Sequence, residues 1–371
     1  MRKFVMRASM LLLIAAALFA LELKYEFVTA DSSAVSSPSS LEQEIYRHLS
    51  EQSREFTVTY TGGQSALSGQ MPQIIQAAMA KDDYIAYIVD SYQYSIQSWS
   101  QRAKIKMVIE YRESIEQTAY VDARVAAVLA EIIEPGMNAH QKVKAIHDWI
   151  VLNVAYDESL QSYTAYEALN NGQAVCQGYS LLAYKMLRAA DVPNRIVEGT
   201  VDTGNHAWNL VNVNGAWYHL DTTWDDPVPD RPGEVSYAYY LKTDEEMRRD
   251  HGWTRSYPAA TTSYADTLAQ LQINDAERGA FYETLEQALG LHWLKSEHIA
   301  TDADALTGRI REAISQGEHS FKVRYLRGDQ LKADIDQAMR AAGGVASYEL
   351  SYQDYGDDGS ILLDVTFTMH P

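Results

Sequence analysis

The spacing of apolar residues divides the central part of the chain into helical and strand-like stretches. Apolar positions three or four residues apart predict helices, whereas alternating ones predict strands. The predicted elements are helices over 120–133, 139–154, 163–169 and 176–190, strands over 195–201 and on both sides of Asn214-Gly215, one further candidate strand over 237–242, and a short helix over 244–250. Helices that come first and antiparallel strands that follow predict an α+β fold for this domain, over 117–260.

The two ends of the chain repeat one order of elements, α-β-α-β-β. Near the N-terminus we predict a helix over 41–49, a strand over 55–60, a helix over 72–80, and strands over 84–95 and 103–110. The C-terminal elements follow the same order. Six apolar positions match without a gap at a constant shift of 265 residues, namely Leu41, Ile45, Leu49, Phe56, Val58 and Tyr60 onto Leu306, Ile310, Ile314, Phe321, Val323 and Tyr325.

Self-similarity of this kind indicates an internal repeat. We therefore predict two copies of one module, over 41–116 and 306–371, flanking the central domain. A helical connector is predicted over 261–305. The alternative is that amphipathic elements of similar length align by chance.

The first 30 residues have the pattern of a signal peptide. Arg2, Lys3 and Arg7 precede an apolar run over 8–21, and Val28-Thr29-Ala30 offers small residues for cleavage. The run is shorter than the roughly 20 residues that span a bilayer. The alternative is an uncleaved N-terminal anchor, and both predict an exported protein, secreted or associated with the cell surface. The Ser-rich stretch 31–40 is predicted to be a flexible spacer.

The charge of the chain excludes several classes of partner. A net charge of -19 repels nucleic acid and anionic membranes, so contact with a membrane is expected only through an uncleaved N-terminal segment. The sequence contains no CxxC, HExxH, EF-hand or P-loop pattern. It therefore signals no metal site and no cofactor.

Cys176 is the only cysteine of the 371 residues. Gly172 and Gly178 bracket it, and the apolar pattern of a helix follows, so Cys176 is predicted in the first turn of that helix. A helix N-terminus stabilises a thiolate and offers backbone N–H groups to an oxyanion. The alternative is a small buried apolar residue. An exported chain with a single thiol cannot use it for an internal disulfide, which favours a reactive role.

A predicted hairpin brings a histidine and an aspartate together. Asn214-Gly215 favours a two-residue type I′ turn. In that register Trp208 faces Asp221, and His206 lies diagonal to Asp221 on the same side of the sheet, about 7–8 Å away at the backbone. A helix N-terminus packed on that side would add the thiol, giving the nucleophile, base and orienting acid of thiol acyl transfer.

Three motifs in this order resemble the transglutaminase-like core superfamily, whose bacterial members share a papain-like fold. They are Gly-x-Ala-Val-Cys-x-Gly-Tyr at 172–179, Asn-His-Ala-Trp-Asn at 205–209 and Trp-Tyr-His-Leu-Asp-x-Thr-Trp-Asp-Asp-Pro at 217–227. The resemblance covers about 138–258. It implies Cys176 as nucleophile, His206 as base and Asp221 as the residue that orients His206. The family includes protein cross-linkers, amide hydrolases and members with no known reaction.

We therefore predict an exported thiol enzyme that attacks peptide or side-chain amides of a peptide or protein, such as one of the cell wall or cell surface. Trp208, Trp224 and Tyr179 are predicted to line its substrate groove. His219 is predicted to be structural, and His147 is predicted to lie at the surface. The alternative is a non-catalytic surface-binding protein that retains the fold as a scaffold.

Overall fold

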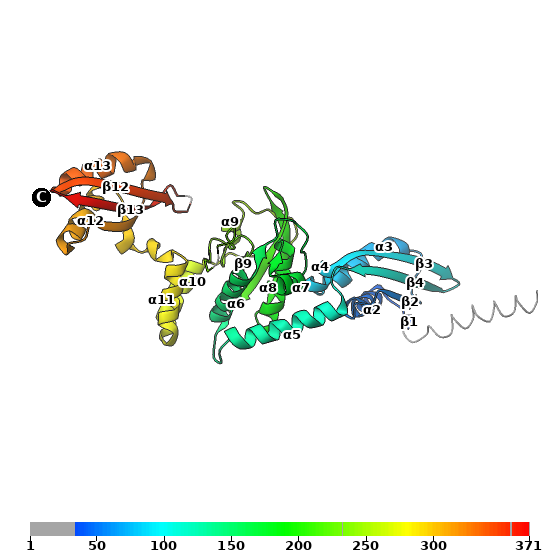
Figure 1. Cartoon of the computed structure of the whole chain (residues 1–371). Coiled ribbons are helices and arrows are strands. Elements are labelled where there is room, and N and C mark those ends of the chain that lie inside the picture. The colour runs from blue at the N-terminus through cyan, green and yellow to red at the C-terminus, as the bar shows by residue number, and fades with distance from the viewer. Residues whose placement is uncertain (1–33, 232, 357, 371) are drawn as a thin grey trace, which may run out of the picture. The chain divides into compact units, whose positions relative to one another are not determined.

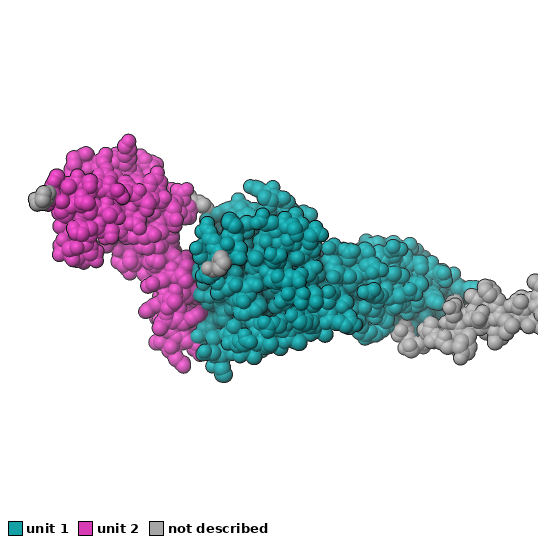
Figure 2. All heavy atoms as spheres, in the orientation of Figure 1, with its two compact units in different colours: residues 1–262 teal, residues 263–371 magenta. Residues whose placement is uncertain are grey.

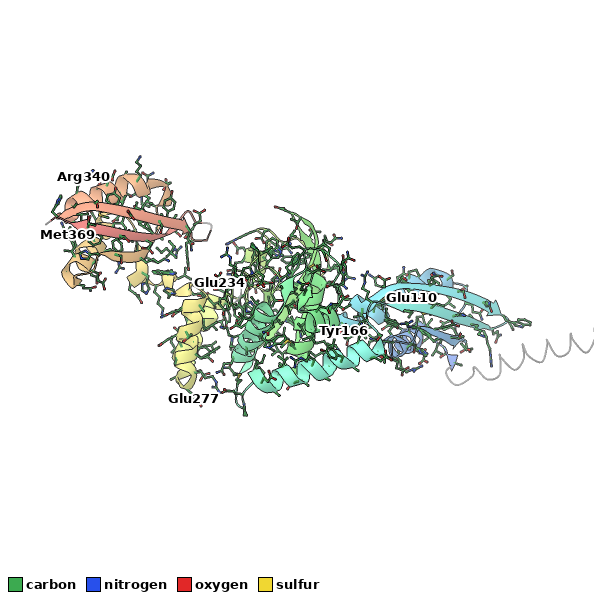
Figure 3. All side chains as sticks on the ribbon, in the orientation of Figure 1. Glu110, Tyr166, Glu234, Glu277, Arg340 and Met369 are labelled. Atoms are coloured by element: carbon green, nitrogen blue, oxygen red, sulfur yellow. The ribbon has the colours of Figure 1, made fainter. Side chains whose placement is uncertain are left out.

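The computed structural model describes residues 34–231, 233–356 and 358–370. The predicted signal peptide lies outside these ranges. The chain forms two compact units, which divide between Thr262 and Ser263 and are coloured separately in Figure 2. No helix in the described ranges is long and apolar enough to cross a membrane. Side chains fill the interior of each unit (Figure 3).

The first unit begins with a four-stranded sheet whose strand order is β1-β2-β4-β3. The elements of this N-terminal part are β1 (Ala34–Val35), α2 (Pro38–Ser50), β2 (Glu55–Tyr60), α3 (Leu67–Met79), α4 (Asp83–Ile88), β3 (Val89–Trp99) and β4 (Arg102–Tyr111). The predicted spacer is wrong for residues 34–40, because they form β1 and the start of α2. Ser37 caps α2 in a capping box with Ser40, which a Ser-rich composition conceals.

The predicted strand over 84–95 is also wrong in its first half. Asp82 accepts hydrogen bonds from the backbone N–H groups of Tyr84 and Ile85 and so starts α4. The strand begins only at Val89.

The central domain packs helices against a three-stranded antiparallel sheet of order β7-β8-β9 (Figure 1). Its elements are α5 (Ile115–Ile132), α6 (Ala139–Asn153), β5 (Ala155–Tyr156), α7 (Ala165–Asn171), β6 (Gln173–Ala174), α8 (Cys176–Ala189), β7 (Asn194–Val201), β8 (Gly204–Val213), β9 (Ala216–Leu220) and α9 (Asp244–Met247). Helix α8 packs on β8 and is buried along most of its length. Residues 237–242 form no strand: the chain turns there and makes only an isolated bridge between Lys242 and His219.

Side-chain hydrogen bonds connect the N-terminal part to the central domain. The Asp83 carboxylate accepts hydrogen bonds from Arg195 Nε at 2.7 Å and from the backbone N–H of Ile196, in β7, at 2.9 Å. Gln177, next to Cys176, donates to the carbonyl oxygen of Tyr87 at 3.0 Å. These contacts fix the sheet of the central domain and the start of α8 to the N-terminal part.

The second unit contains the predicted connector and the C-terminal elements together. Its elements are α10 (Tyr264–Asn274), η1 (Ala276–Arg278), α11 (Gly279–Ala288), η2 (Leu291–Leu294), η3 (Ser296–His298), β10 (Ile299–Ala300), α12 (Ala303–Gln316), β11 (Ser320–Tyr325), η4 (Gly328–Gln330), α13 (Leu331–Ala342), β12 (Val345–Asp354) and β13 (Ile361–Met369), where η denotes a 3-10 helix. The connector ends in β10, which is part of the C-terminal sheet.

The two outer sheets have matching topology and register. The C-terminal strand order, β10-β11-β13-β12, corresponds strand for strand to β1-β2-β4-β3. The parallel pair Ala34 and Thr59 in the first sheet corresponds to Ile299 and Arg324 in the second, again 265 positions later. Both sheets also carry a register irregularity at the start of the outer strand, at Val89 and at Val345.

Candidate active site

Cys176 is the first residue of α8, as predicted. The chain leaves α7 through Gly172, whose φ of 67° lies in the left-handed region that favours glycine. Strand β6 then pairs with β5 and leads into the helix. Gly178 is required by close packing, since a Cβ there would lie 2.6 Å from the Ala174 Cβ. The two glycines that bracket the cysteine thus fix where α8 begins.

The predicted hairpin register is confirmed. Val213 pairs with Ala216, and both Asn214 and Gly215 have positive φ, as a type I′ turn requires. His206 Nε2 lies 2.6 Å from Asp221 Oδ2. The local turn chemistry therefore brings this histidine and this carboxylate into direct contact.

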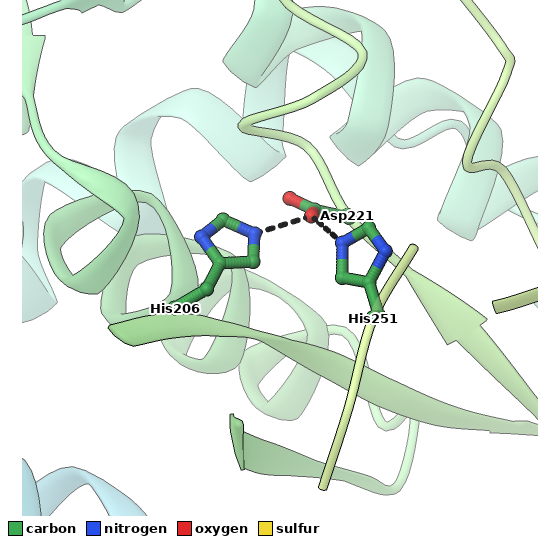
Figure 4. A group of neighbouring side chains, drawn as sticks. All are labelled: His206, Asp221 and His251. Carbon is green, nitrogen blue, oxygen red and sulfur yellow. Dashed lines mark hydrogen bonds and ion pairs between the residues drawn. The ribbon is translucent and has the colours of Figure 1, made fainter. Parts of the chain in front are cut away.

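Asp221 is completely buried and accepts four hydrogen bonds. Its Oδ1 accepts from the backbone N–H groups of Thr223 and Trp224, at 2.9 and 3.2 Å. Its Oδ2 faces both His206 Nε2 and, at 3.2 Å, His251 Nε2 (Figure 4). Burial opposes the charge of the carboxylate, but the two histidines outweigh burial and hold the pKa of Asp221 well below its usual range.

The ring of His206 connects Asp221 to Cys176. Burial lowers the pKa of His206, but the charge of Asp221, their hydrogen bond and a hydrogen bond with the Cys176 side chain together raise that pKa to about 10. Because Nε2 is bonded to Asp221, Nδ1 is the ring nitrogen left for the sulfur. The second ring nitrogen points away from Asp221 in Figure 4. The His206 ring thus links the sole thiol to the buried carboxylate.

A cavity of about 680 Å³ opens beside Cys176 and His206. Trp224 lines it, as predicted, and so does Tyr156, whose pKa is raised by burial and by the nearby Cys176. The same lining contains three carboxylates, those of Glu158, Asp226 and Glu234, and one guanidinium, that of Arg231. Burial raises the pKa of Asp226 to about 6.

Two of the predicted groove residues do not line this cavity. Trp208 is 1% exposed, and its indole N–H donates to His219 Nδ1 at 2.9 Å. Tyr179 is fully buried, with its hydroxyl 2.8 Å from the Val154 carbonyl oxygen. The groove prediction for both is wrong because alternation gives the side of a strand but not what packs over it. Here Trp253 and His251 cover Trp208.

His147 is also placed differently from its prediction. It is fully buried rather than at the surface, with Nε2 3.0 Å from Asp225 Oδ2 and Nδ1 3.0 Å from Asp148 Oδ1. Burial opposes its charge, but the two carboxylates hold the pKa of His147 above its usual value. His219 is packed and hydrogen-bonded to Trp208 and Asp244, which fits the structural role predicted for it.

The sequence analysis did not single out His251. It lies just after α9 and is 2% exposed. His206, Asp221 and His251 offer three potential metal-ligand atoms within 4.8 Å of one another. The direct hydrogen bonds from Asp221 to both rings account for the cluster without an ion. The adjacent pair Asp250-His251 was the only signal in the sequence, and it does not indicate which carboxylate the ring meets.

Part of the chain is similar to known proteins. Residues 126–222 match the sequence profile of the Transglutaminase-like superfamily, and this part of the chain is therefore a transglutaminase-like domain. Over 155 residues the chain is 24% identical to the kyphoscoliosis peptidase of Mus musculus, covering 36% of this chain and 23% of that protein.

Over 121 residues it is 26% identical to the kyphoscoliosis peptidase of Homo sapiens, covering 28% of this chain and 18% of that protein. The chain thus spans less than a quarter of the length of these curated relatives. It is also similar to the solved structure of a TGase, with a TM-score of 0.29 and 12% identity, covering 60% of this chain and 68% of that one.

Proposed function

We propose that this protein is a thiol enzyme that transfers or hydrolyses acyl groups of peptide or side-chain amides. The observation that carries the proposal is the contact chain from Cys176 through His206 to the buried Asp221, beside an open cavity. Each part has a chemical role: a nucleophile, a proton carrier and a carboxylate that orients it.

In the proposed reaction, the Cys176 thiolate adds to the amide carbonyl carbon. The backbone N–H of Cys176, at the start of α8, is placed to donate to the oxyanion. His206 then gives its proton to the leaving nitrogen, the C–N bond breaks and a thioester remains. Water or a second amine attacks the thioester, loses a proton to His206 and releases Cys176. Asp221 stabilises the imidazolium throughout.

The acceptor decides between the reaction types. Water gives a peptidase or a deamidase, whereas an amine gives a cross-linker. The acidic lining of the cavity favours neutral or basic partners over acidic ones, since three carboxylates outnumber Arg231. We also propose export, from the charge and apolar pattern of residues 1–30, and a peptide or protein of the cell wall or surface as substrate.

The pH dependence of alkylation by iodoacetamide tests the proposal, since Cys176 is the sole thiol. We expect reaction to persist at neutral pH and below, with a midpoint well under the free-thiol value of about 8.5. The chain unfolded in denaturant is the matched control and should return to that value. A folded protein that also titrates near 8.5 contradicts the proposal. Turnover of a peptide-amide library, with and without an added amine, then separates hydrolysis from transfer.

A non-catalytic binding role is the second candidate, favoured by exposed aromatic residues on the outer strands. Trp99 in β3 is 76% exposed and Tyr352 in β12 is 64% exposed. We propose that the two sheets are copies of one module, supported by their matching strand order and register. Pull-down on cell-wall material with wild type and Cys176→Ala tests this role. Equal binding without any amide turnover favours it over the enzyme.

A further inference from the structure

His251 lies behind the candidate triad, in an entirely enclosed position. Its backbone N–H donates to the carbonyl oxygen of Met247 at 2.8 Å, which fixes the residue to the end of α9. Its ring packs against Trp208 and Trp224, with centroids 5.0 and 4.5 Å away. The ring is therefore held between aromatic neighbours, and its hydrogen-bond partners define where each of its nitrogens lies.

Each nitrogen of that ring faces a carboxylate oxygen. Nε2 lies 3.2 Å from Asp221 Oδ2, and Nδ1 lies 2.5 Å from Asp250 Oδ1. An ionised carboxylate only accepts hydrogen bonds, so both contacts are satisfied only when both nitrogens carry hydrogen. Tyr239 donates its hydroxyl to the other oxygen of Asp250 at 2.6 Å, so both oxygens of that carboxylate act as acceptors.

The oxygen of Asp221 that accepts from His251 is the same one that accepts from His206. One carboxylate thus serves two imidazole rings, whose centroids are 5.4 Å apart (Figure 4). A neutral hydrogen-bond donor would suffice to orient Asp221. A cationic donor does more, because it offsets part of the negative charge that acts on His206 and Cys176.

We propose that His251 is a positioning residue of the thiol site, a cationic ring that holds Asp221 in place and sets the pH range in which the Cys176 and His206 pair is charged. This inference depends on the proposed function above. The charged and titratable groups that face His251 are Asp221, Asp250, His206, Tyr239 and, at longer range, His219.

The charge of His251 has a defined effect on its neighbours. A nearby positive charge stabilises a thiolate and disfavours a second imidazolium, so it lowers the pH at which each of the two groups loses its proton. Removal of that charge should raise the pH at which Cys176 and His206 each lose a proton. His251→Gln can keep an N–H for Asp221 and removes the charge, together with the donor to Asp250. We expect the midpoint of Cys176 alkylation by iodoacetamide to rise by about one pH unit in this variant.

His219→Gln is the matched control. His219 is equally buried and hydrogen-bonded to a carboxylate, but burial lowers its pKa and it makes no contact with Asp221. Loss of this neutral ring should leave the midpoint in place. A midpoint that is unchanged in His251→Gln, with only a uniformly lower rate, overturns the inference. A wild-type midpoint near 8.5 overturns the proposed function instead, so the two failures are distinct.

A measurement on the wild type covers the case in which His251→Gln does not fold. With ¹⁵N-labelled histidine, NMR should show both ring nitrogens of His251 protonated at neutral pH. A ring with one unprotonated nitrogen overturns the inference without any variant.

Discussion

Two imidazole–carboxylate pairs lie at the two ends of the turn over 221–225. Only one of them adjoins the thiol and the cavity. His206 meets Asp221 at the start of the turn, and His147 meets Asp225 at its end. The two aspartates are linked directly, since the backbone N–H of Asp225 donates to the carbonyl oxygen of Asp221 at 3.2 Å. Both carboxylates are fully buried.

The difference lies in what each ring meets on its other side. The second nitrogen of His206 faces the sole thiol and an open cavity, whereas that of His147 faces Asp148, beside Lys144 and Tyr237. A raised histidine pKa occurs in both pairs and therefore does not identify a site. A site is indicated only where such a histidine also meets a nucleophile and an open cavity, as His206 does.

Loss of the charge at the first pair should have the largest effect. Asp221→Asn is expected to lower turnover by about 10³–10⁴-fold, because the amide cannot stabilise an imidazolium as a carboxylate does. Steady-state kinetics on an amide substrate measure this. Asp225→Asn makes the same change at the other end of the turn and should leave turnover per folded molecule unchanged. Equal losses in the two variants would mean that the pairs act together.

The second pair should matter for stability instead. His147→Gln breaks a buried ionic cluster and is expected to cost about 3–5 kcal/mol of unfolding free energy. Urea denaturation measures this cost, and the rate of Cys176 alkylation in the folded fraction should match wild type. A variant that is as stable as wild type but slower to react would place His147 in the site.

The pH dependence of stability should carry the signature of His206. Its pKa in the folded protein, about 10, is above the ordinary value of 6.5. Its contribution is therefore fully present below pH 6.5 and is lost as the pH rises through about 10. We expect the advantage of wild type over His206→Gln in unfolding free energy to shrink across this window. A constant difference from pH 6 to 10.5 would argue against a charged His206.

The smallest expected effects distinguish the two tryptophans near His206. Trp208→Phe leaves His219 Nδ1 without its buried donor and should cost about 1–3 kcal/mol of stability. Trp224→Phe changes the cavity wall and should raise KM with little change in melting temperature. Thermal unfolding and KM for both variants check this. The reverse pattern would place Trp208, not Trp224, at the substrate.

The parts of the site that follow from local chemistry were predictable from the sequence. The Asn214-Gly215 turn sets the register that joins His206 to Asp221, and two glycines set the start of α8. His251 was not predictable in the same way. It reaches Asp221 because its segment crosses to the edge of β7, where Thr200 and Gly252 form a bridge, and no neighbouring residues encode that crossing.

The outer helices and strands were likewise predictable where local patterns define them. The apolar matches between the two ends predicted most of the outer helices and strands, because amphipathic spacing reports which face is buried. Helix α4 was missed because residues 84–88, Tyr-Ile-Ala-Tyr-Ile, are rich in the aromatic and β-branched types that favour strands, and only the cap at Asp82 indicates a helix.

Asp83, at the start of α4, bears on how short a folded fragment that carries the candidate site can be. Its carboxylate holds the Ile196 backbone N–H and the Arg195 side chain of β7. Cutting the chain just before α5 would leave that N–H and that cation without their acceptor, at the edge of the sheet that carries His206. The smallest fragment that folds on its own and keeps the Cys176 site should therefore start near residue 34 and not near residue 117.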